Sequence, residues 1–547
     1  MSVDLPSAPP LEKNPTPSAE DINSALEQLT FGALDAIRIA RQKAEVYTQE
    51  DLRLAALEPN DFGNGMRLRA RFGDRLFYIA EVGWHGWTGT HWSREKGDVI
   101  ARKLADDTHT LIFQEARALA EAGAWPKENP EDFEKRVGRH LALAVISGNV
   151  NKRNAMLESA ASYLTRTVEE TDPDPYLFNC ANGTLDLMAD TRPRKKKRDG
   201  EVDSVRFRKH DARDFITCLS PVDYDPKALC PKWRLFLDQV LPDKDVQLFM
   251  QQWAGLSLTG DTSAQSLVLE YGTGANGKST MDDVIRYILG DYAKIIGFTS
   301  LLRDDKRRGA EASPDLARLR GARAAFASEP EHSVKFSEGL IKSLTGGEPI
   351  TARYLNKNFF EYLPRFKMWL AFNNKPTVQG TDTGIWRRLK LVPFTVTIPP
   401  EKRNPKLTEE LKAEASGILN WMLDGYRHWR EKGLVVPAAV KVATEEYQAE
   451  SDHMRDFLAD ALEADPDSRV QGAVMFATYQ RWCRANAVFA ALQQTMFGKR
   501  MTQSYPKVKD GVMFYVGCRL KGRWADDGHH GGDGPPPDEG PPPYESI

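Results

Sequence analysis

The sequence predicts a multidomain α/β protein with a P-loop core, a mostly helical N-terminal region and a C-terminal unit of helices followed by a β-hairpin. The first observation is a glycine-rich motif, YGTGANGKST at residues 271–280, which lies between a predicted strand and a predicted helix. The second is a series of short apolar segments downstream, with polar residues beside them. The third is the length of 547 residues, enough for roughly three or four domains at ~150 residues each.

The motif at residues 271–280 has the GxxxxGK(S/T) spacing of a phosphate-binding loop. Its glycines let successive N–H groups point at one phosphate, and the following helix adds its dipole. We expect Lys278 to reach the β- and γ-phosphates of ATP and the Ser279 hydroxyl to bind Mg²⁺. The competing interpretation, a chance glycine-rich turn, leaves the flanking strand at 266–271 and helix at 279–289 unexplained. The predicted ATP-binding residues are Gly272, Thr273, Gly274, Ala275, Asn276, Gly277, Lys278, Ser279 and Thr280.

Three kinds of polar group accompany the later strands, in an order that suits nucleotide hydrolysis. Glu329 follows the apolar run AAFA, where a Walker B acid would bind the metal, activate water or do both. Asn373 follows the strand KMWLAF and is placed to orient the attacking water. Arg387 and Arg388 precede a further apolar strand, where one of them would act as an arginine finger for a neighbouring subunit. A surface glutamate and two structural, ion-pairing arginines are the alternatives.

A β-hairpin is predicted between the acid and the asparagine, because ITARYL and FFEYL flank the turn residues NKN. Lys357 lies near its tip, where an ammonium would bind a DNA phosphate as a point charge. Arg353 and Lys342 are supporting DNA-binding candidates. An ordinary surface hairpin with a solvated lysine fits this segment equally well.

The ordered motifs GTGANGKS, ASEPE, KSLTGGEPITARYLNKNFFEYLP, LAFNNKP and GIWRRLKLVPF resemble those of superfamily 3 helicases, and more closely the phage and plasmid primase-helicases. Upstream, PYLFNCANGTLDL and WAGLSLTGD are similar to the region that precedes the ATPase in that family. The resemblance covers roughly residues 174–394. It implies an AAA+ P-loop ATPase core, a homo-hexameric ring with ATP between subunits, and 3′–5′ translocation on single-stranded DNA by a staircase of central hairpins.

The resemblance also implies a role for each matching residue. These roles are nucleotide and metal binding for Lys278 and Ser279, the Walker B acid for Glu329, sensor 1 for Asn373, the tip of the pore hairpin for Lys357, and the trans finger for Arg387 or Arg388. The sequence departs from many relatives in two ways. The first ~170 residues show no convincing cluster of metal-binding acids, so we expect no primer synthesis. Only one acid is well placed at Walker B, so its metal and base roles cannot be separated.

The C-terminal unit is expected to form helices at 452–464, 472–485 and 491–504, followed by a β-hairpin turned at residues 509–511. Helices followed by a β-hairpin resemble a winged helix, which the family often carries at this place. Lys499 and Arg500 would then lie on its DNA-recognition helix. A compact helical cap with no role in DNA binding is the alternative.

Composition and patterning divide the whole chain into seven segments. They are a disordered leader (1–21), an N-terminal helical domain with a small β unit (22–170), a β and linker region (171–235), the AAA+ helicase core (236–405), a helical lid or linker (406–450), a winged-helix-like DNA-binding domain (451–523), and a disordered acidic Gly/Pro tail (524–547). Within the second segment, Trp84, Trp87 and Trp92 suit a sheet core better than base stacking. In the third, the basic run RPRKKKRDG at 192–200 either contacts DNA phosphates or has no role.

The formal net charge of −3 does not exclude nucleic-acid binding, because six acids lie in the final 24 residues and the remainder carries +3. The five cysteines are scattered, which predicts reduced thiols and no zinc site. No apolar run reaches about 18 residues, so no membrane association is expected. These features predict a protein of the cytoplasm, and the phage resemblance implies a bacterial host cell.

The sequence therefore predicts an ATP-dependent replicative DNA helicase of a phage or mobile element, acting on single-stranded and forked DNA. A separate primase or polymerase of the replisome is a possible partner. Two alternatives stay open. One is an origin-binding initiator in which ATP controls assembly without processive unwinding. The other is a primase-helicase with a diverged N-terminal primase.

Overall fold

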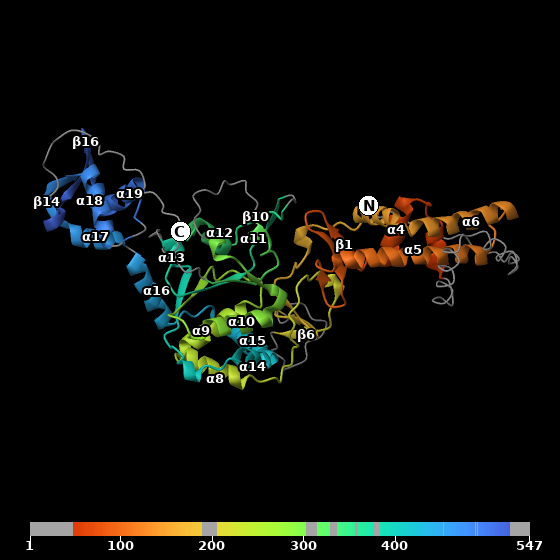
Figure 1. Ribbon diagram of the computed structural model, residues 1–547, viewed down its shortest axis with the longest axis horizontal. Coiled ribbons are helices and arrows are strands. Elements are labelled where there is room, and N and C mark those ends of the chain that lie inside the picture. The colour runs from red at the N-terminus through yellow and green to blue at the C-terminus, as the bar shows by residue number, and fades with distance from the viewer. Residues whose placement is uncertain are drawn as a thin grey trace, which may run out of the picture.

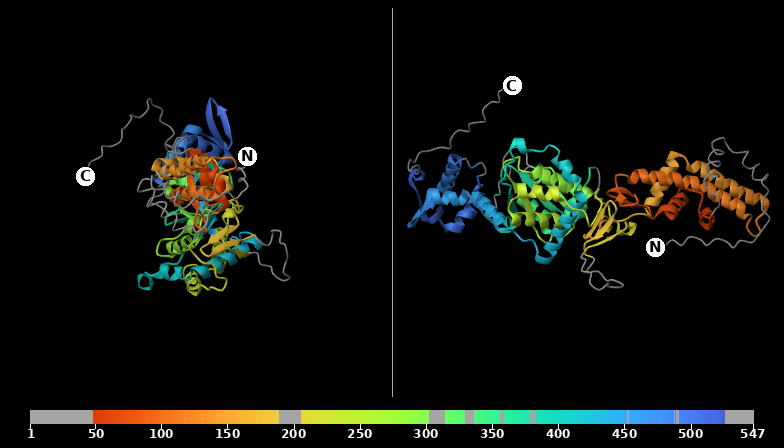
Figure 2. Two further views of the ribbon diagram at one scale, coloured as in Figure 1. Left: turned by 90° about the vertical axis from the view of Figure 1, so that its right-hand side faces the viewer. Right: turned by 90° about the horizontal axis from the view of Figure 1, so that it is seen from below.

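The computed structural model describes residues 48–188, 205–301, 314–328, 336–355, 359–376, 378, 383–451, 453–486, 488 and 491–525. The molecule is elongated, with a helical N-terminal module at one end, an α/β core in the middle and a small C-terminal domain at the other end (Figures 1 and 2). The expected leader, the basic run at 192–200 and nearly all of the acidic tail lie outside the described residues.

The N-terminal module is mostly helical, as predicted, and contains an antiparallel sheet in the order β1-β2-β3. Its β unit, which the sequence predicted over residues 66–98, is shorter than expected, because residues 66–72 belong to a helix. That helix begins at Asn60, whose side chain accepts a hydrogen bond from the Gly63 N–H at 2.8 Å. The elements are α3 (Gln49–Ala55), α4 (Asp61–Phe72), β1 (Leu76–Ile79), β2 (Gly83–Trp87), β3 (Trp92–Ser93), α5 (Gly97–Ala122), α6 (Pro130–Ser147) and α7 (Val150–Ala161).

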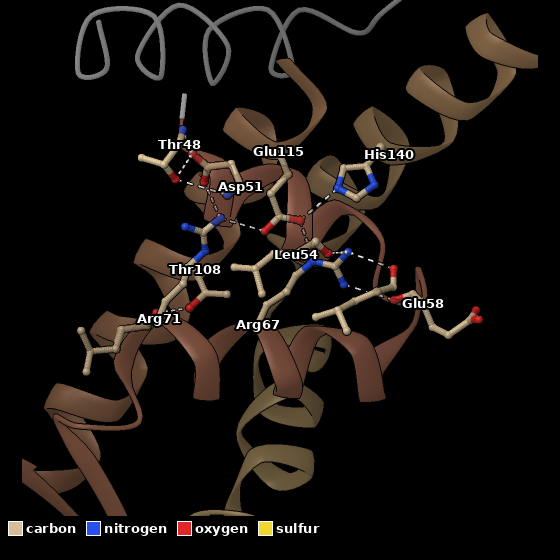
Figure 3. A network of polar contacts seen from close by, with 11 residues as sticks. Thr48, Asp51, Leu54, Glu58, Arg67, Arg71, Thr108, Glu115 and His140 are labelled. Atoms are coloured by element: carbon tan, nitrogen blue, oxygen red, sulfur yellow. Dashed lines mark hydrogen bonds and ion pairs between the residues drawn. The ribbon is translucent and has the colours of Figure 1, made fainter. Parts of the chain in front are cut away.

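A buried network of charged side chains joins four helices of this module (Figure 3). Glu115 of α5 accepts from Arg67 Nε at 2.8 Å and from Arg71 Nη2 at 2.9 Å, both of α4. His140 of α6 lies 3.1 Å from the same carboxylate, and Arg71 also pairs with Asp51 of α3 at 2.8 Å. Burial alone would raise the pKa of Glu115, but the His140 hydrogen bond and the Arg67 charge outweigh it and lower this pKa.

The tryptophans of the small sheet fill its core, as the favoured interpretation predicted. Trp92 is 3% exposed and Trp84 is 9% exposed. The Trp92 indole donates to the Ala212 carbonyl at 2.8 Å, and the Trp92 backbone N–H donates to the Ile216 carbonyl at 2.9 Å. These bonds attach the N-terminal module to the segment that leads into the core.

The core is a five-stranded parallel sheet in the order β13-β7-β12-β9-β8. A three-stranded antiparallel sheet, β4-β5-β6, precedes it, and the predicted β-hairpin forms an antiparallel pair, β10-β11. The strands are β4 (Leu177–Cys180), β5 (Gly183–Asp186), β6 (Arg206–Arg208), β7 (Leu267–Tyr271), β8 (Ala293–Ile295), β9 (Ala324–Ser328), β10 (Ile350–Ala352), β11 (Phe360–Tyr362), β12 (Lys367–Phe372) and β13 (Leu389–Pro393).

Both faces of the parallel sheet are covered, so its strands read as continuous apolar runs. Val268, Phe326 and Trp369 pack on one face with α8, α9, α10 and α15 (Figure 1). Leu269, Leu370 and their neighbours pack on the other face with α12, α13 and α16. The helices are α8 (Pro231–Val240), α9 (Lys244–Leu256), α10 (Lys278–Leu289), α11 (Pro314–Ala317), α12 (Glu338–Gly346), α13 (Thr383–Trp386), α14 (Leu407–Lys412), α15 (Ala415–Lys432) and α16 (Ala438–Ser451).

The C-terminal domain has its own apolar core, built around Phe457, Tyr479 and Phe497. Its helices and final hairpin are confirmed, with one correction. Residues 462–464, expected at the end of a helix, begin strand β14, which pairs with β16. The elements are α17 (His453–Ala461), β14 (Leu462–Gln471), α18 (Gly472–Ala485), α19 (Gln494–Ser504), β15 (Lys507–Asp510) and β16 (Val512–Leu520).

All five cysteines are buried and unpaired. Across the described ranges, no helix is long and apolar enough to span a bilayer.

The buried network predicts a large, local cost for removing its central acid. Glu115→Gln should destabilise the N-terminal module by about 3–5 kcal/mol, because Arg67 would stay buried without its counter-charge and Arg71 would keep only Asp51. Hydrogen exchange of α3 to α6 peptides in the full chain measures this. Because the folded pKa of Glu115 is lowered, its contribution is present above pH ~4.5 and declines as the pH falls further.

Glu121→Gln on the same helix is the matched control, since the Arg117–Glu121 pair is exposed and should contribute less than about 0.5 kcal/mol. Equal protection of the two variants would contradict the role assigned to Glu115.

Candidate functional site

The predicted phosphate-binding loop lies between β7 and α10, as the motif requires. Gly274 and Gly277 have φ angles of +101° and +87°, conformations that glycine adopts without strain. Lys278 is 5% exposed, and its ammonium donates to the Gly272 carbonyl at 2.6 Å. The Asn276 side chain is buried and donates to the Phe394 carbonyl at 3.4 Å. Side chains at Thr273, Ala275 and Ser279 are exposed, so the loop is open to a ligand.

The structure brings Asn373 to this loop. Strands β7 and β12 are parallel, with Tyr271 level with Phe372, so both chains leave the sheet at the same edge. The Lys278 ammonium donates to Asn373 Oδ1 at 3.2 Å. Strand β9 is the next neighbour of β12 and ends at Ser328. Glu329 follows directly in the chain but lies outside the described residues, so its predicted role stays a prediction.

Arg387 and Arg388 are not equivalent. The Arg388 guanidinium is buried, donating to Thr345 Oγ1 at 3.1 Å and to the Gly384 carbonyl at 2.5 Å. Arg387 is exposed and donates to Gln265 Oε1 at 3.3 Å. Both arginines lie before β13, whose first residue is level with Leu267 at the start of β7. They therefore lie at the edge of the sheet opposite the phosphate-binding loop.

The predicted DNA-binding residues are only partly described. The hairpin strands β10 and β11 pair as Ile350 with Tyr362, but the tip with Lys357 lies outside the described residues. Arg353 stacks on the Phe359 ring at 4.6 Å, and Lys342 is half-buried on α12.

In the C-terminal domain, the predicted recognition helix is α19. Its Lys499 is exposed and Arg500 is half-buried, before a hairpin whose strand β15 is exposed throughout.

Two carboxyl groups beside the loop were missed by sequence reasoning. Glu270 is the fourth residue of β7 and is 0% exposed; Asp282 lies on α10, one turn after Lys278. Burial, followed by the charge of Asp282, raises the pKa of Glu270 well above its usual range. Burial also raises the pKa of Asp282, to about 7, although the Glu270 hydrogen bond lowers it. The available signal was an acid within the apolar run SLVLEY.

Comparisons with known proteins agree with this arrangement. Residues 65–242 match the family model described as "D5 N terminal like", and residues 449–518 match the one described as "Poxvirus D5 protein-like". These two ranges flank the parallel-sheet core. They confirm the resemblance to primase-helicases.

Viral proteins are also similar to the chain. "Putative helicase L207/L206" of Acanthamoeba polyphaga mimivirus is 29% identical over 411 residues, which is 71% of this chain and 41% of that protein. "Putative helicase 022R" of Frog virus 3 is 26% identical over 65% of this chain and 44% of that protein. "Putative primase C962R" of African swine fever virus is 24% identical over 41% of this chain and 22% of that protein.

This chain thus spans less than half the length of the curated relatives it matches. These relatives belong to viruses of eukaryotes and lend no support to the bacterial host expected from the sequence. A solved structure, the C-terminal region of NrS-1, covers 54% of this chain and 77% of that chain at 12% identity, with a TM-score of 0.35 that is too low to carry an argument.

The geometry predicts that a single methyl group in the loop disrupts nucleotide binding. A Cβ on Gly272 would lie 2.1 Å from Asn276 Nδ2 and 2.5 Å from the Phe394 carbonyl oxygen, so the loop would have to shift. Gly272→Ala should weaken the binding of a fluorescent ATP analogue at least about tenfold, or 1.4 kcal/mol.

Gly339→Ala on α12 is the control, because its new Cβ meets no atom within 4 Å. Unchanged affinity in Gly272→Ala would show that this loop does not bind the nucleotide.

Proposed function

We propose that the chain is an ATP-dependent DNA helicase of the superfamily 3 type, with an AAA+ core, which replicates the DNA of a virus or mobile element. It assembles as a homo-hexameric ring, translocates 3′–5′ on single-stranded DNA and opens forked DNA. Relatives named as helicases and primases support the helicase class and a role in DNA replication. The cytoplasm of a host cell and a separate primase or polymerase partner belong to the same proposal.

The predicted phosphate-binding loop contacts the predicted sensor, Asn373, but lies far from the predicted finger, Arg387. The Lys278 ammonium contacts Asn373 within the subunit. Arg387 lies at the other edge of the sheet, across the five residues of β7. At about 3.3 Å per residue, this separates it from its own loop by roughly 16 Å. An exposed arginine so placed suits the ATP bound to a neighbouring subunit better than its own.

In the proposed mechanism, residues of two adjacent subunits contribute to ATP hydrolysis. Lys278 and the backbone N–H groups of the loop hold the β- and γ-phosphates. Asn373 moves from Lys278 to the γ-phosphate and orients the attacking water, which Glu329 activates. Arg387 of the adjacent subunit stabilises the charge of the transition state. Arg388 holds Arg387 in place through its bonds to Thr345 and Gly384.

The site suits Mg²⁺ that arrives with the nucleotide. The described residues include no group of three acids, histidines or cysteines able to hold a metal alone. Mg²⁺ in such sites binds mainly to phosphate oxygens and water, so a few protein oxygens suffice. The exposed Ser279 hydroxyl and the Glu329 carboxylate would supply them, and the ion would neutralise the β- and γ-phosphates.

Two surfaces are proposed to bind DNA. The first is the β10–β11 hairpin, with Lys357 at its tip and Arg353 and Lys342 nearby, which would line the ring pore. The second is the C-terminal domain, where helices α18 and α19 followed by the β15–β16 hairpin support a winged helix. Lys499 and Arg500 of α19 would contact DNA there.

Strand displacement on a forked substrate with ATP tests this function. Lys278→Ala should abolish both ATP hydrolysis and displacement, because the phosphates lose their cation. Lys357→Ala should keep DNA-independent hydrolysis but lose displacement more than about tenfold, because the motor no longer grips the phosphate backbone. Lys135→Ala, an exposed lysine on α6, is the control and should retain both activities.

If Lys357→Ala displaces strands at the wild-type rate, the hairpin assignment is wrong. If the wild type hydrolyses ATP but displaces no strand at forks of either polarity, the initiator alternative replaces the helicase.

A further inference from the structure

Two carboxyl groups lie beside the predicted phosphate-binding loop, that of Glu270 fully buried and that of Asp282 half-buried. Both oxygens of Glu270 and Oδ1 of Asp282 are buried and have no hydrogen-bond donor among the described residues. Glu270 lies two residues after Val268, which packs with Met281 and Ile285 of α10, so Glu270 points towards the same helix. Asp282 belongs to that helix, and the two carboxyl groups are close enough for each to shift the pKa of the other.

The strands beside Glu270 offer no compensating charge. Ala371 of β12 and Val392 of β13 are level with it, and Ser328 follows in the same row on β9. Among the described residues, the charged groups that act on the pair are Lys278, Asp283 and Arg286, all of α10. Arg286 has a larger effect than Lys278 on the pKa of Asp282, but it is ion-paired with Asp283, whereas Lys278 is the cation that belongs to the loop motif.

Ionising both carboxyl groups at once is unfavourable, because their mutual repulsion adds to the cost of charging the fully buried Glu270. One proton shared by the pair removes the repulsion and supplies a hydrogen-bond donor, since a protonated carboxyl group can donate to a carboxylate. Burial raises the pKa of both groups, that of Asp282 to about 7, so the pair gains or loses a proton near neutral pH. The number of protons on the pair is therefore sensitive to any change in nearby charge.

Nucleotide binding makes such a change. Lys278 lies one helical turn from Asp282, and its positive charge favours the ionised carboxylate. When phosphates bind Lys278, they neutralise this charge, and the ionised state of Asp282 becomes less stable. We propose that Glu270 and Asp282 form a proton-accepting pair that takes up a proton when a nucleoside triphosphate binds to Lys278. This inference rests on the nucleotide binding that is part of the proposed function.

The sign of the pH dependence follows directly. A complex that binds more protons than the free protein is favoured at lower pH, so nucleotide affinity should rise as the pH falls from 8 to 6. Uptake of one whole proton would change the affinity tenfold per pH unit. Uptake of about half a proton, expected near the titration midpoint of Asp282, changes it about threefold. Both carboxyl groups therefore act on the nucleotide through Lys278, as positioning residues.

Calorimetric titration of the full chain with Mg²⁺ and AMP-PNP tests this at pH 6, 7 and 8. At pH 7, two buffers with different ionisation enthalpies give the number of protons taken up. At pH 7 the wild type should take up about half a proton, and its affinity should change about threefold per pH unit near that pH. The double variant Glu270→Gln/Asp282→Asn should bind AMP-PNP without this additional proton uptake, because neither amide titrates. Protonation of AMP-PNP itself contributes equally to both proteins and cancels in the comparison.

Asp424→Asn on α15 is the matched control, since it removes a carboxylate that is 54% exposed, paired with Arg427 and not among the groups that act on the pair. This variant should keep the proton uptake of the wild type. Equal proton uptake by the wild type and the double variant would overturn the proposal while leaving nucleotide binding intact. Should the double variant fail to fold, absence of proton uptake by the wild type alone overturns it. Failure of the wild type to bind AMP-PNP would instead overturn the proposed function and this inference with it.

Discussion

The parallel register of β7 with β12 and β13 is the constraint on which the site depends. Strands β7 and β12 are parallel and paired from Leu267 with Met368 to Tyr271 with Phe372. The loop after β7 and Asn373 after β12 therefore lie at the same edge of the sheet. The same register holds the start of β13, and Arg387 before it, at the opposite edge. Among the described residues, the predicted phosphate-binding loop and Asn373 thus lie together, whereas the exposed Arg387 lies at the opposite edge of the sheet. We propose that the subunits assemble into a ring because each loop then receives Arg387 from the neighbouring subunit.

The opposite edge of the sheet is also where the core is tied to the N-terminal half. Arg323, just before β9, donates to the Leu177 carbonyl at 2.5 Å and to the Leu258 carbonyl. Lys367, the first residue of β12, donates to the carbonyls of Thr259 and Asp261. Burial lowers the pKa of Lys367 well below its usual range, because enclosing the charged ammonium is unfavourable. The carbonyls of Thr259 and Asp261 offset part of this cost by accepting its hydrogen bonds. The strands that end at Ser328 and beside Asn373 thus begin at fixed anchor points.

Much of the core could be predicted from the sequence because its signals are local. A glycine-rich loop between an apolar run and a helical pattern needs no distant partner to be recognised, and β7 and α10 formed as expected. The approach of Asn373 to Lys278 followed from the rule that parallel strands meet their ligands at one edge. Strand β14 could not be predicted, because its sequence LEADPDSRVQ is polar and it forms by pairing with β16, about 50 residues later.

Properties that depend on burial were the least predictable. Arg387 and Arg388 are adjacent and chemically identical, and only their packing shows that one is enclosed by Thr345 and Gly384 while the other faces solvent. Glu270 interrupts an apolar strand, but its significance depends on Asp282 lying opposite, which requires the helix to be placed on the sheet. Spacing in the chain therefore located the predicted phosphate-binding loop, whereas the charges around it could be identified only from the packed structure.

Mixing two inactive variants tests most directly whether one site is shared by two subunits. Lys278→Ala removes the phosphate-binding cation and Arg387→Ala removes the proposed finger, so each protein alone should hydrolyse ATP at a small fraction of the wild-type rate. In rings reassembled from equal amounts, about a quarter of the interfaces would combine an intact loop with an intact Arg387. Recovery of hydrolysis towards that fraction is the predicted result. Full hydrolysis by Arg387→Ala alone, or no recovery in mixed rings, would contradict a shared site.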